Sequence, residues 1–135
     1  MNKNIFEKIR DGEEKADIVY KDDYITAFKD IDPNAPVHIL IIPNKKIHSL
    51  NDIQEEDSNY LSNILLGAKK IAKQFNIHQT GYRLITNCGC DGGQEVQYLH
   101  FHLVGGLKLG KMISLSKSEK KKFSELKSLN KIETQ

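Results

Sequence analysis

The chain has 135 residues, of which 39% are hydrophobic and 28% are charged, and its formal net charge is +2. This length and composition are typical of one globular domain. No apolar run approaches the roughly 18 residues of a membrane span, and the net charge is too small to favour nucleic acid as the main partner. Cys88 and Cys90 are too close for an ordinary disulfide, and the first residues contain no signal-like apolar region, so we expect a cytoplasmic protein.

The first third of the chain predicts a short helix and three strands. Apolar residues at positions 5, 6 and 9 indicate a short amphipathic helix over residues 4–10. Residues 17–20 and 24–29 predict a hairpin. Residues 37–42 are apolar on both faces, which predicts a central strand.

The middle of the chain predicts one long helix and two further strands. Apolar residues recur at helical spacing from about residue 54 to residue 75, with Asn51 or Asp52 as the expected N-cap and an acidic first turn. Residues 82–87 and 96–104 predict the fourth and fifth strands. The short antiparallel connections favour an α+β fold with a meander-like sheet, covered on one face by the long helix.

The residues after Met112 differ in character from those before. We expect residues 1–112 to form the domain and residues 113–135 to form a basic tail, helical or partly disordered. Ser116 and Glu119 have the spacing of a capping box, which indicates a terminal helix.

Residues 98–105 (YLHFHLVG) carry most of the chemistry. As a strand, this segment places the imidazoles of His100 and His102 on one face and its apolar side chains on the other. Gly92-Gly93-Gln94 precedes it as a flexible segment whose backbone N–H groups are able to face an anion. Histidine is the usual side chain for proton transfer near neutral pH, and paired imidazoles suit a phosphate ester or a metal. The stretch therefore indicates an active-site strand entered through a glycine loop.

A third histidine is expected to join this pair. His38 follows the proline-containing loop over residues 30–36 and begins the central strand, so three imidazoles converge if that strand neighbours the strand of His100. His48 and His78 lie in polar, loop-like contexts and are expected to be exposed.

Together these segments resemble the histidine-triad (HIT) family, in particular the bacterial histidine-triad nucleotide-binding proteins that cleave purine nucleoside phosphoramidates. The resemblance covers residues 5 to 112 and rests on segments 5–9, 27–31, 35–43, 81–84, 92–94 and the signature stretch through Gly106. It implies a HIT-like fold, with a five-stranded antiparallel sheet, one long helix and a short N-terminal helix. It also implies a homodimer in which the two sheets join across a shared edge and helix.

The resemblance also implies the residues of a site. His100 corresponds to the nucleophile of the family, and His102 and His38 to two further catalytic histidines. Asp30 is expected to hold the ribose hydroxyls. The implied wall of the base site comprises Ile5, Phe6, Ile9, Phe28 and Ile31. The implied surroundings of the α-phosphate comprise Asn87, Gly93, Gln94, Glu95 and His102.

The implied reaction is hydrolysis of a P–N bond without metal or cofactor. A neutral imidazole, the main form at pH 7 for an ordinary pKa of about 6.5, attacks phosphorus and forms a nucleotidyl-His100 intermediate. Water then releases AMP or GMP, while the amine has left with a proton. Backbone N–H groups over residues 93–95 and the ring of His102 are expected to stabilise charge on the phosphoryl oxygens.

The chain departs from the family pattern at the first signature position, which is Tyr98 instead of histidine. The backbone carbonyl of Tyr98 is still able to hold the ring of His100, but a phenol with a pKa near 10 is a poor proton shuttle at pH 7. We therefore expect nucleotide binding to persist and turnover to fall. A nucleotide-binding regulatory protein with weak or lost catalysis remains the alternative.

A metal site is a further alternative. Cys88, Cys90, His100 and His102 offer thiolates and imidazoles, which are zinc ligands, although their spacing is not that of the common zinc motifs.

Overall fold

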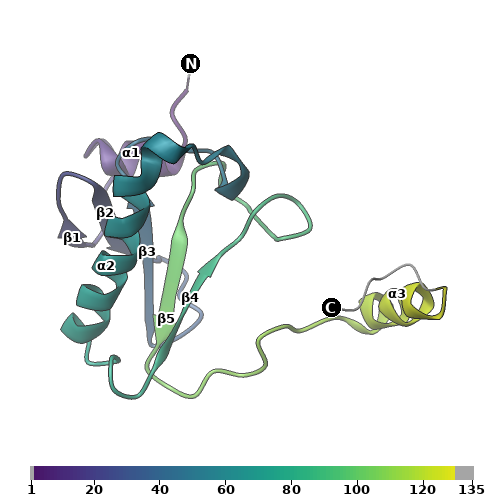
Figure 1. The fold of residues 1–135 in the computed structure, drawn as a ribbon. Helices are drawn as coiled ribbons and strands as arrows, with labels where there is room; N and C mark the ends of the chain where they lie inside the picture. Colours follow the sequence, from purple (N-terminus) through teal and green to yellow (C-terminus); the bar gives the residue numbers. More distant parts are fainter. Residues whose placement is uncertain (1, 130–135) are drawn as a thin grey trace.

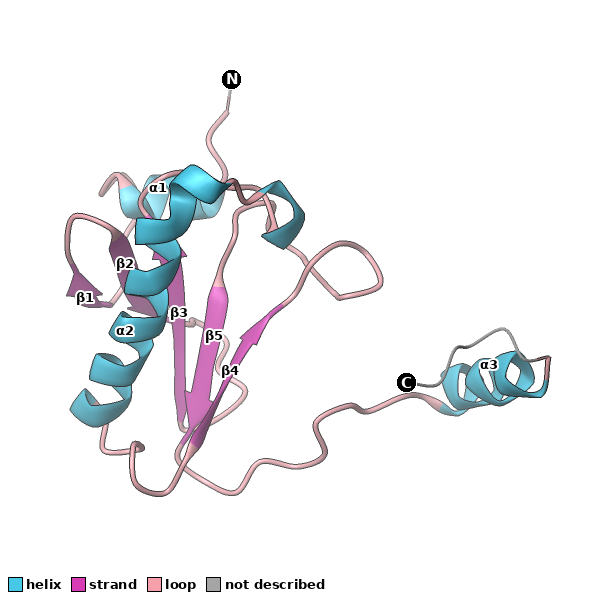
Figure 2. Cartoon of the chain, viewed as in Figure 1, coloured by secondary structure: helices cyan, strands magenta, loops and turns pink. Residues whose placement is uncertain are grey.

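A five-stranded antiparallel sheet with a long helix across one face forms the body of the protein (Figures 1 and 2). The computed structural model describes residues 2–129; Met1 and residues 130–135 of the expected tail lie outside the described part. In chain order the elements are α1 (Ile5–Arg10), β1 (Ile18–Lys21), β2 (Ile25–Lys29), β3 (Val37–Pro43), the 3-10 turns η1 (Leu50–Asp52) and η2 (Glu55–Asp57), α2 (Ser58–Gln74), β4 (Tyr82–Thr86), β5 (Phe101–Gly105) and α3 (Lys117–Ser128).

The strand order is β1-β2-β3-β5-β4, and every neighbouring pair is antiparallel. The expected α+β class and five-stranded antiparallel sheet are confirmed, but the meander-like order holds only for the first three strands. After β3, helix α2 carries the chain to the far edge of the sheet, where β4 forms, and β5 then returns between β3 and β4 (Figure 1). This return brings the strand of His38 beside the strand that carries His102.

The central strand β3 is apolar on both faces, as expected, because each face packs against a different layer. Ile39 and Ile41 belong to the core beneath α2. Leu40 and Ile42 belong to a second core on the opposite face, which α1 covers with the side chain of Phe6. Since residues of one strand alternate between faces, His38 shares the α1 face.

The long helix begins later than the sequence indicates. Its N-cap is Asp57, neither Asn51 nor Asp52, and its first turn holds no acidic residue. The preceding residues form two 3-10 turns instead, because Ser49 caps the first and the Asp57 carboxylate accepts a bond from the Gln54 N–H in the second. Within residues 2–129, no helix is long and apolar enough to cross a membrane.

The fifth strand is shorter than expected and begins at Phe101. Before it the chain leaves the ladder: the Leu99 N–H donates to the Ile47 carbonyl, and the His100 carbonyl accepts from the Thr86 hydroxyl. Farther on, helix α3 forms with the expected Ser116–Glu119 capping box and buries none of its residues.

Candidate active site

Three imidazoles meet on the α1 face of the sheet. Nε2 of His38 lies 2.9 Å from Nδ1 of His102, and the ring centroids of His102 and His100 are 5.1 Å apart. The pairing of β3 with β5 produces this arrangement, because its register sets Leu40 opposite His102 and His38 opposite Val104. The sequence predicts that the three imidazoles converge if their strands are neighbours, and the structure confirms this.

The ring of His100 is held in one tautomer. Its Nδ1 lies 2.6 Å from the Tyr98 carbonyl oxygen, which is able only to accept, so Nδ1 carries the proton and Nε2 carries the lone pair. The residue is 6% exposed, and its ring makes an edge contact with Phe6 at 4.9 Å between centroids. Burial lowers the pKa of His100 below its ordinary value of 6.5. At neutral pH the ring therefore offers an uncharged nucleophilic nitrogen.

The other two rings are ordered by a chain of hydrogen bonds. The backbone N–H of Asn34 donates to Nδ1 of His38 over 3.0 Å, so in its neutral form His38 carries its proton on Nε2 and donates it to Nδ1 of His102. His102 then carries its own proton on Nε2. Burial, together with the neighbouring rings of His100 and His38, lowers the pKa of His102 to about 4. His102 is thus a neutral hydrogen-bond donor.

A cavity of about 610 Å³ opens in front of these rings, a size that suits a small-molecule ligand. Its apolar end comes from α1 and β2, and its polar end comes from β3, β5 and the loops beside them. The expected site residues that line it are Ile5, Phe6, Ile9, Phe28, Asp30, Ile31, His38, Asn87, Gly93, Glu95, His100 and His102. Of the expected set, only Gln94 does not line the cavity.

Asp30 and Ile31 lie at the rim, in the loop that leads into β3. One carboxylate oxygen of Asp30 accepts from the Asp32 N–H over 2.8 Å, and the other lies 3.5 Å from Nε2 of His38. Ile31 is 96% exposed, so it contributes an edge of the cavity and no buried wall.

The glycine loop does not present its N–H groups as expected. The N–H of Gly93 donates to the Cys90 carbonyl, and that of Gln94 donates to the Gly89 carbonyl, so both are engaged inside the loop. Within residues 2–129, the Glu95 N–H makes no such bond.

The side chain of Gln94 holds this loop in place instead of facing the cavity. Its amide nitrogen donates to the carbonyls of His48 and Val96, and its oxygen accepts from the Gly89 N–H. The Asn87 amide, which does line the cavity, donates to the Gly92 carbonyl over 2.7 Å.

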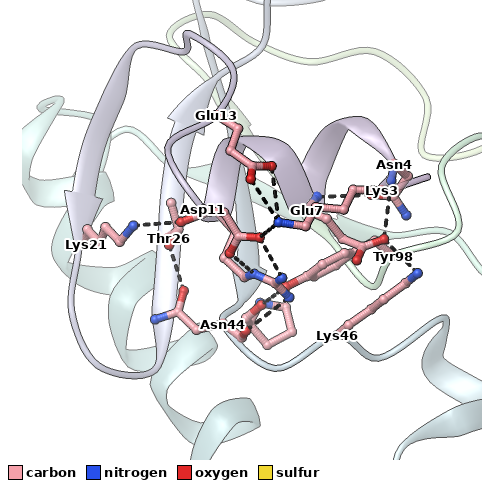
Figure 3. A network of polar contacts seen from close by, with 12 residues as sticks. Lys3, Asn4, Glu7, Asp11, Glu13, Lys21, Thr26, Asn44, Lys46 and Tyr98 are labelled. Atoms are coloured by element: carbon pink, nitrogen blue, oxygen red, sulfur yellow. Dashed lines mark hydrogen bonds and ion pairs between the residues drawn. The ribbon is translucent and has the colours of Figure 1, made fainter. Parts of the chain in front are cut away.

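Tyr98 is completely buried and lines no cavity that contains the imidazoles. Figure 3 shows Tyr98 among the polar side chains around α1. Its hydroxyl donates to the Pro43 carbonyl, and the guanidinium of Arg10 lies 5.9 Å from its ring centroid. Burial raises the pKa of Tyr98. The backbone of Tyr98 orients His100, as the resemblance implies, while its side chain belongs to the packing beneath α1.

The sequence does not indicate the role of Asn34, and the zinc site that it offers as an alternative for Cys88 and Cys90 is not seen among residues 2–129. Asn34 acts on His38 through its backbone N–H, which no side-chain pattern reveals. In the described part of the chain, the one group of three or more possible metal ligands is Asp30, His38 and His102. The alternative zinc site of Cys88, Cys90, His100 and His102 is therefore not formed. His48 and His78 are exposed, as expected.

The comparisons with known proteins agree with this fold. A family model described as the HIT domain matches residues 11–109. Purine nucleoside phosphoramidase of Escherichia coli K12 is 51% identical over 110 residues, which is 82% of this chain and 92% of that protein. An uncharacterized HIT-like protein of Buchnera aphidicola (subspecies Baizongia pistaciae) is 53% identical over 112 residues, which is 83% of this chain and all of that protein.

Solved structures show the same likeness. A histidine triad protein from Clostridium difficile superposes with a TM-score of 0.79 at 45% identity, covering 84% of this chain and all of that one. A HIT family hydrolase from Clostridium thermocellum gives 0.80 at 43% identity, covering 84% and 99%. The chain therefore belongs to the HIT family.

Proposed function

We propose that the protein hydrolyses the P–N bond of purine nucleoside 5′-phosphoramidates and releases AMP or GMP and an amine. The observation that carries this proposal is the tautomer of His100, whose Nδ1 proton is held by the Tyr98 carbonyl so that an uncharged Nε2 is left to attack phosphorus. The name of the E. coli relative, purine nucleoside phosphoramidase, supports the same substrate class.

The two ends of the cavity suit the two ends of a nucleotide. Phe6 and Phe28 make an edge contact at 5.5 Å between ring centroids and, with Ile9, give the apolar end a surface for a purine ring. The carboxylate of Asp30 suits the vicinal hydroxyls of ribose, because its oxygens accept and both hydroxyls donate. This placement leaves the α-phosphate beside His100 and His102.

The reaction then proceeds in two displacements. Nε2 of His100 bonds to phosphorus as the P–N bond breaks, and the departing nitrogen takes up a proton from solvent and leaves as the amine. The Nε2–H of His102 donates to a phosphoryl oxygen and stabilises the charge that develops there. Water next attacks the nucleotidyl-His100, its oxygen bonds to phosphorus and loses a proton to solvent, and His100 leaves with its lone pair restored. Of the N–H groups of residues 93–95, those of Gly93 and Gln94 are bonded within the loop, while that of Glu95 has no hydrogen-bond partner in the described part of the chain and is available to the phosphate.

A nucleotide-binding regulatory protein with weak or lost catalysis is the second candidate. The buried, Pro43-bound phenol of Tyr98 favours it, since this position supplies no imidazole to relay protons. The two candidates share the binding residues and differ only in turnover.

We also propose that two copies join through the edge of the sheet at β4 and the outer side of α2. β4 is an edge strand, and on α2 the apolar side chains of Leu65 and Leu66 are 57% and 55% exposed. A second copy that continues the sheet covers both features. Sedimentation equilibrium of the wild type and of Leu65→Asp tests this: we expect a dimer that the charged variant weakens, and a wild type that stays monomeric contradicts it.

The experiment for the activity is a steady-state assay of adenosine and guanosine 5′-phosphoramidates with the wild type, His100→Ala and His78→Ala. We expect the wild type and His78→Ala, which alters an exposed imidazole, to release AMP or GMP at equal rates. His100→Ala should lose about 10³-fold or more, and rapid quenching should show a nucleotidyl group on His100 of the wild type. Nucleotide binding without product supports the regulatory protein and overturns the hydrolase.

A further inference from the structure

A second cavity of about 340 Å³ lies directly beside the first. The two share the residues Asn34, His38, Asn87 and His102, so they meet at the imidazole pair. The residues that line only the second cavity are Ala35, Arg83, Ile85, Val104, Leu109 and Gly110. The proposed nucleotide placement does not use this space.

The second cavity lies on the side of His102 that faces away from the nucleophile. His102 and Val104 lie on one face of β5, and His100 directly precedes that strand. His102 lines both cavities, His100 lines only the first, and Val104 lines only the second. In an in-line displacement, the leaving group departs opposite the attacking atom. A phosphorus atom attacked from His100 therefore directs its amine towards the second cavity.

One charged side chain lines this cavity. Arg83 of β4 pairs with Val104 of β5, which places both on the face of the imidazoles. Arg83 is half-buried as a residue, and one terminal nitrogen of its guanidinium donates to the Gly110 carbonyl in an exposed hydrogen bond. The remaining N–H groups of the guanidinium bond no other residue among 2–129. A guanidinium matches a carboxylate with two parallel hydrogen bonds. The other residues found only in this cavity are apolar or glycine.

We propose that this second cavity is the subsite for the leaving amine and that Arg83 selects amines that carry a carboxylate, as in nucleoside phosphoramidates of amino acids. Ala35, Ile85 and Leu109 line the same space and suit the aliphatic part of such an amine. The inference rests on the proposed hydrolase function and names the substrate class within it.

The test compares two adenosine 5′-phosphoramidates, one of glycine and one of glycinamide, which differ in a carboxylate against a neutral amide of the same size. For each enzyme we divide the kcat/KM for the glycine substrate by the kcat/KM for the glycinamide substrate. We then divide the ratio of the wild type by the ratio of Arg83→Gln. This quotient removes the intrinsic difference in basicity between the two leaving amines, because both enzymes act on the same two substrates. We expect this quotient to be about 10, the effect of one charge-assisted hydrogen-bonded pair, with Arg83→Lys giving an intermediate value.

Lys111→Gln is the matched control, since it removes one exposed positive charge next to Gly110 without lining either cavity. We expect it to keep the wild-type ratio. A quotient near 1 for Arg83→Gln, or an equal loss in Lys111→Gln, overturns the assignment of Arg83 while leaving the hydrolase proposal intact. If the wild type cleaves adenosine 5′-phosphoramidate but neither the glycine nor the glycinamide derivative, the amine subsite is overturned. If it cleaves none of the three, the hydrolase proposal itself is overturned.

Discussion

Nε2 of His38 lies 2.9 Å from Nδ1 of His102, and the two rings come from neighbouring strands. Because the Asn34 N–H occupies the other nitrogen of His38, the proton between the rings belongs to His38, and the proton of His102 lies on Nε2. In the proposed reaction, His38 therefore acts by setting the tautomer of His102, in the same way that the Tyr98 carbonyl sets the tautomer of His100.

Replacing His38 by phenylalanine removes the donor to Nδ1 of His102. His102 is then able to populate both tautomers, and we expect kcat to fall about 10- to 100-fold with a smaller change in KM. Nitrogen-15 NMR of the His102 ring provides the direct readout: a single Nε2–H tautomer in the wild type and a mixture in the variant. A variant that keeps the single tautomer contradicts this role.

The pH dependence of the activity follows from the buried position of His100. Protonation of Nε2 removes the lone pair, so activity is lost as the pH falls through the pKa of His100. Since burial lowers that pKa below 6.5, we expect kcat/KM to stay constant from neutral pH down past 6.5 and to decrease only in more acidic solution. A profile that already declines at or above pH 6.5 argues against an uncharged, buried nucleophile.

The stability of the fold should depend on pH through His102. Its pKa is about 4 in the folded protein and 6.5 by default in the unfolded chain, so between these values the unfolded state binds a proton that the folded state does not. The free energy of unfolding therefore decreases as the pH is lowered from 6.5 towards 4. Urea unfolding at several pH values measures the slope, and His102→Gln, which lacks the titrating ring, should show a shallower one. Equal slopes rule out this linkage.

The placement of His100 and His102 on one face is predictable from the sequence because it depends on local alternation, although β5 is shorter than expected and begins one residue after His100. The period of two places His100 and His102 on one face whatever their partners are. The position of β5 between β3 and β4 is not predictable in this way, since no local signal encodes the order of strands in a sheet. That order decides whether His38 reaches His102.

The glycine loop shows why backbone groups are harder to predict than side chains. Gly93 has a φ of +81°, and the turn that it completes directs its N–H to the Cys90 carbonyl. The same composition in another turn leaves that N–H free for an anion. The interpretation of residues 93–95 as a phosphate cradle is therefore confined to the Glu95 N–H, and the structural role of Gln94 depends on three bonds that composition does not specify.

Variants of Tyr98 test whether the tyrosine that replaces the first histidine of the family pattern has a structural or a catalytic role. Its hydroxyl donates to the Pro43 carbonyl, which Tyr98→Phe leaves without that donor, at a cost of about 1–2 kcal/mol in the free energy of unfolding. Since the phenol lines neither cavity, kcat of Tyr98→Phe should stay within about 3-fold of the wild type.

Tyr98→His is the companion variant, because it restores the residue of the family pattern. The sequence predicts that it raises turnover by about 10- to 10³-fold, the range of one general acid–base contribution. Thermal unfolding and steady-state kinetics of both variants separate the two roles. If Tyr98→His turns over no faster than the wild type, the missing imidazole does not limit this enzyme.

The loop that carries Asn87 and Gly93 should tolerate no side chain at Gly92. A Cβ there would lie 2.4 Å from the Cys88 carbonyl oxygen, and this contact involves backbone that is unable to rotate away. Gly92 also accepts the hydrogen bond from the Asn87 amide, so a shift of the loop moves a residue that lines the cavity. We expect Gly92→Ala to lower kcat/KM about 10- to 100-fold, in keeping with the effect of a small misplacement near the reacting atoms.

Because the loop of Gly92 lies outside the sheet ladder, the midpoint of global unfolding of Gly92→Ala should change little. Cys90→Ala, which alters an exposed side chain of the same loop, should match the wild type in both measurements, and an equally active Gly92→Ala shows that the loop does not position the substrate.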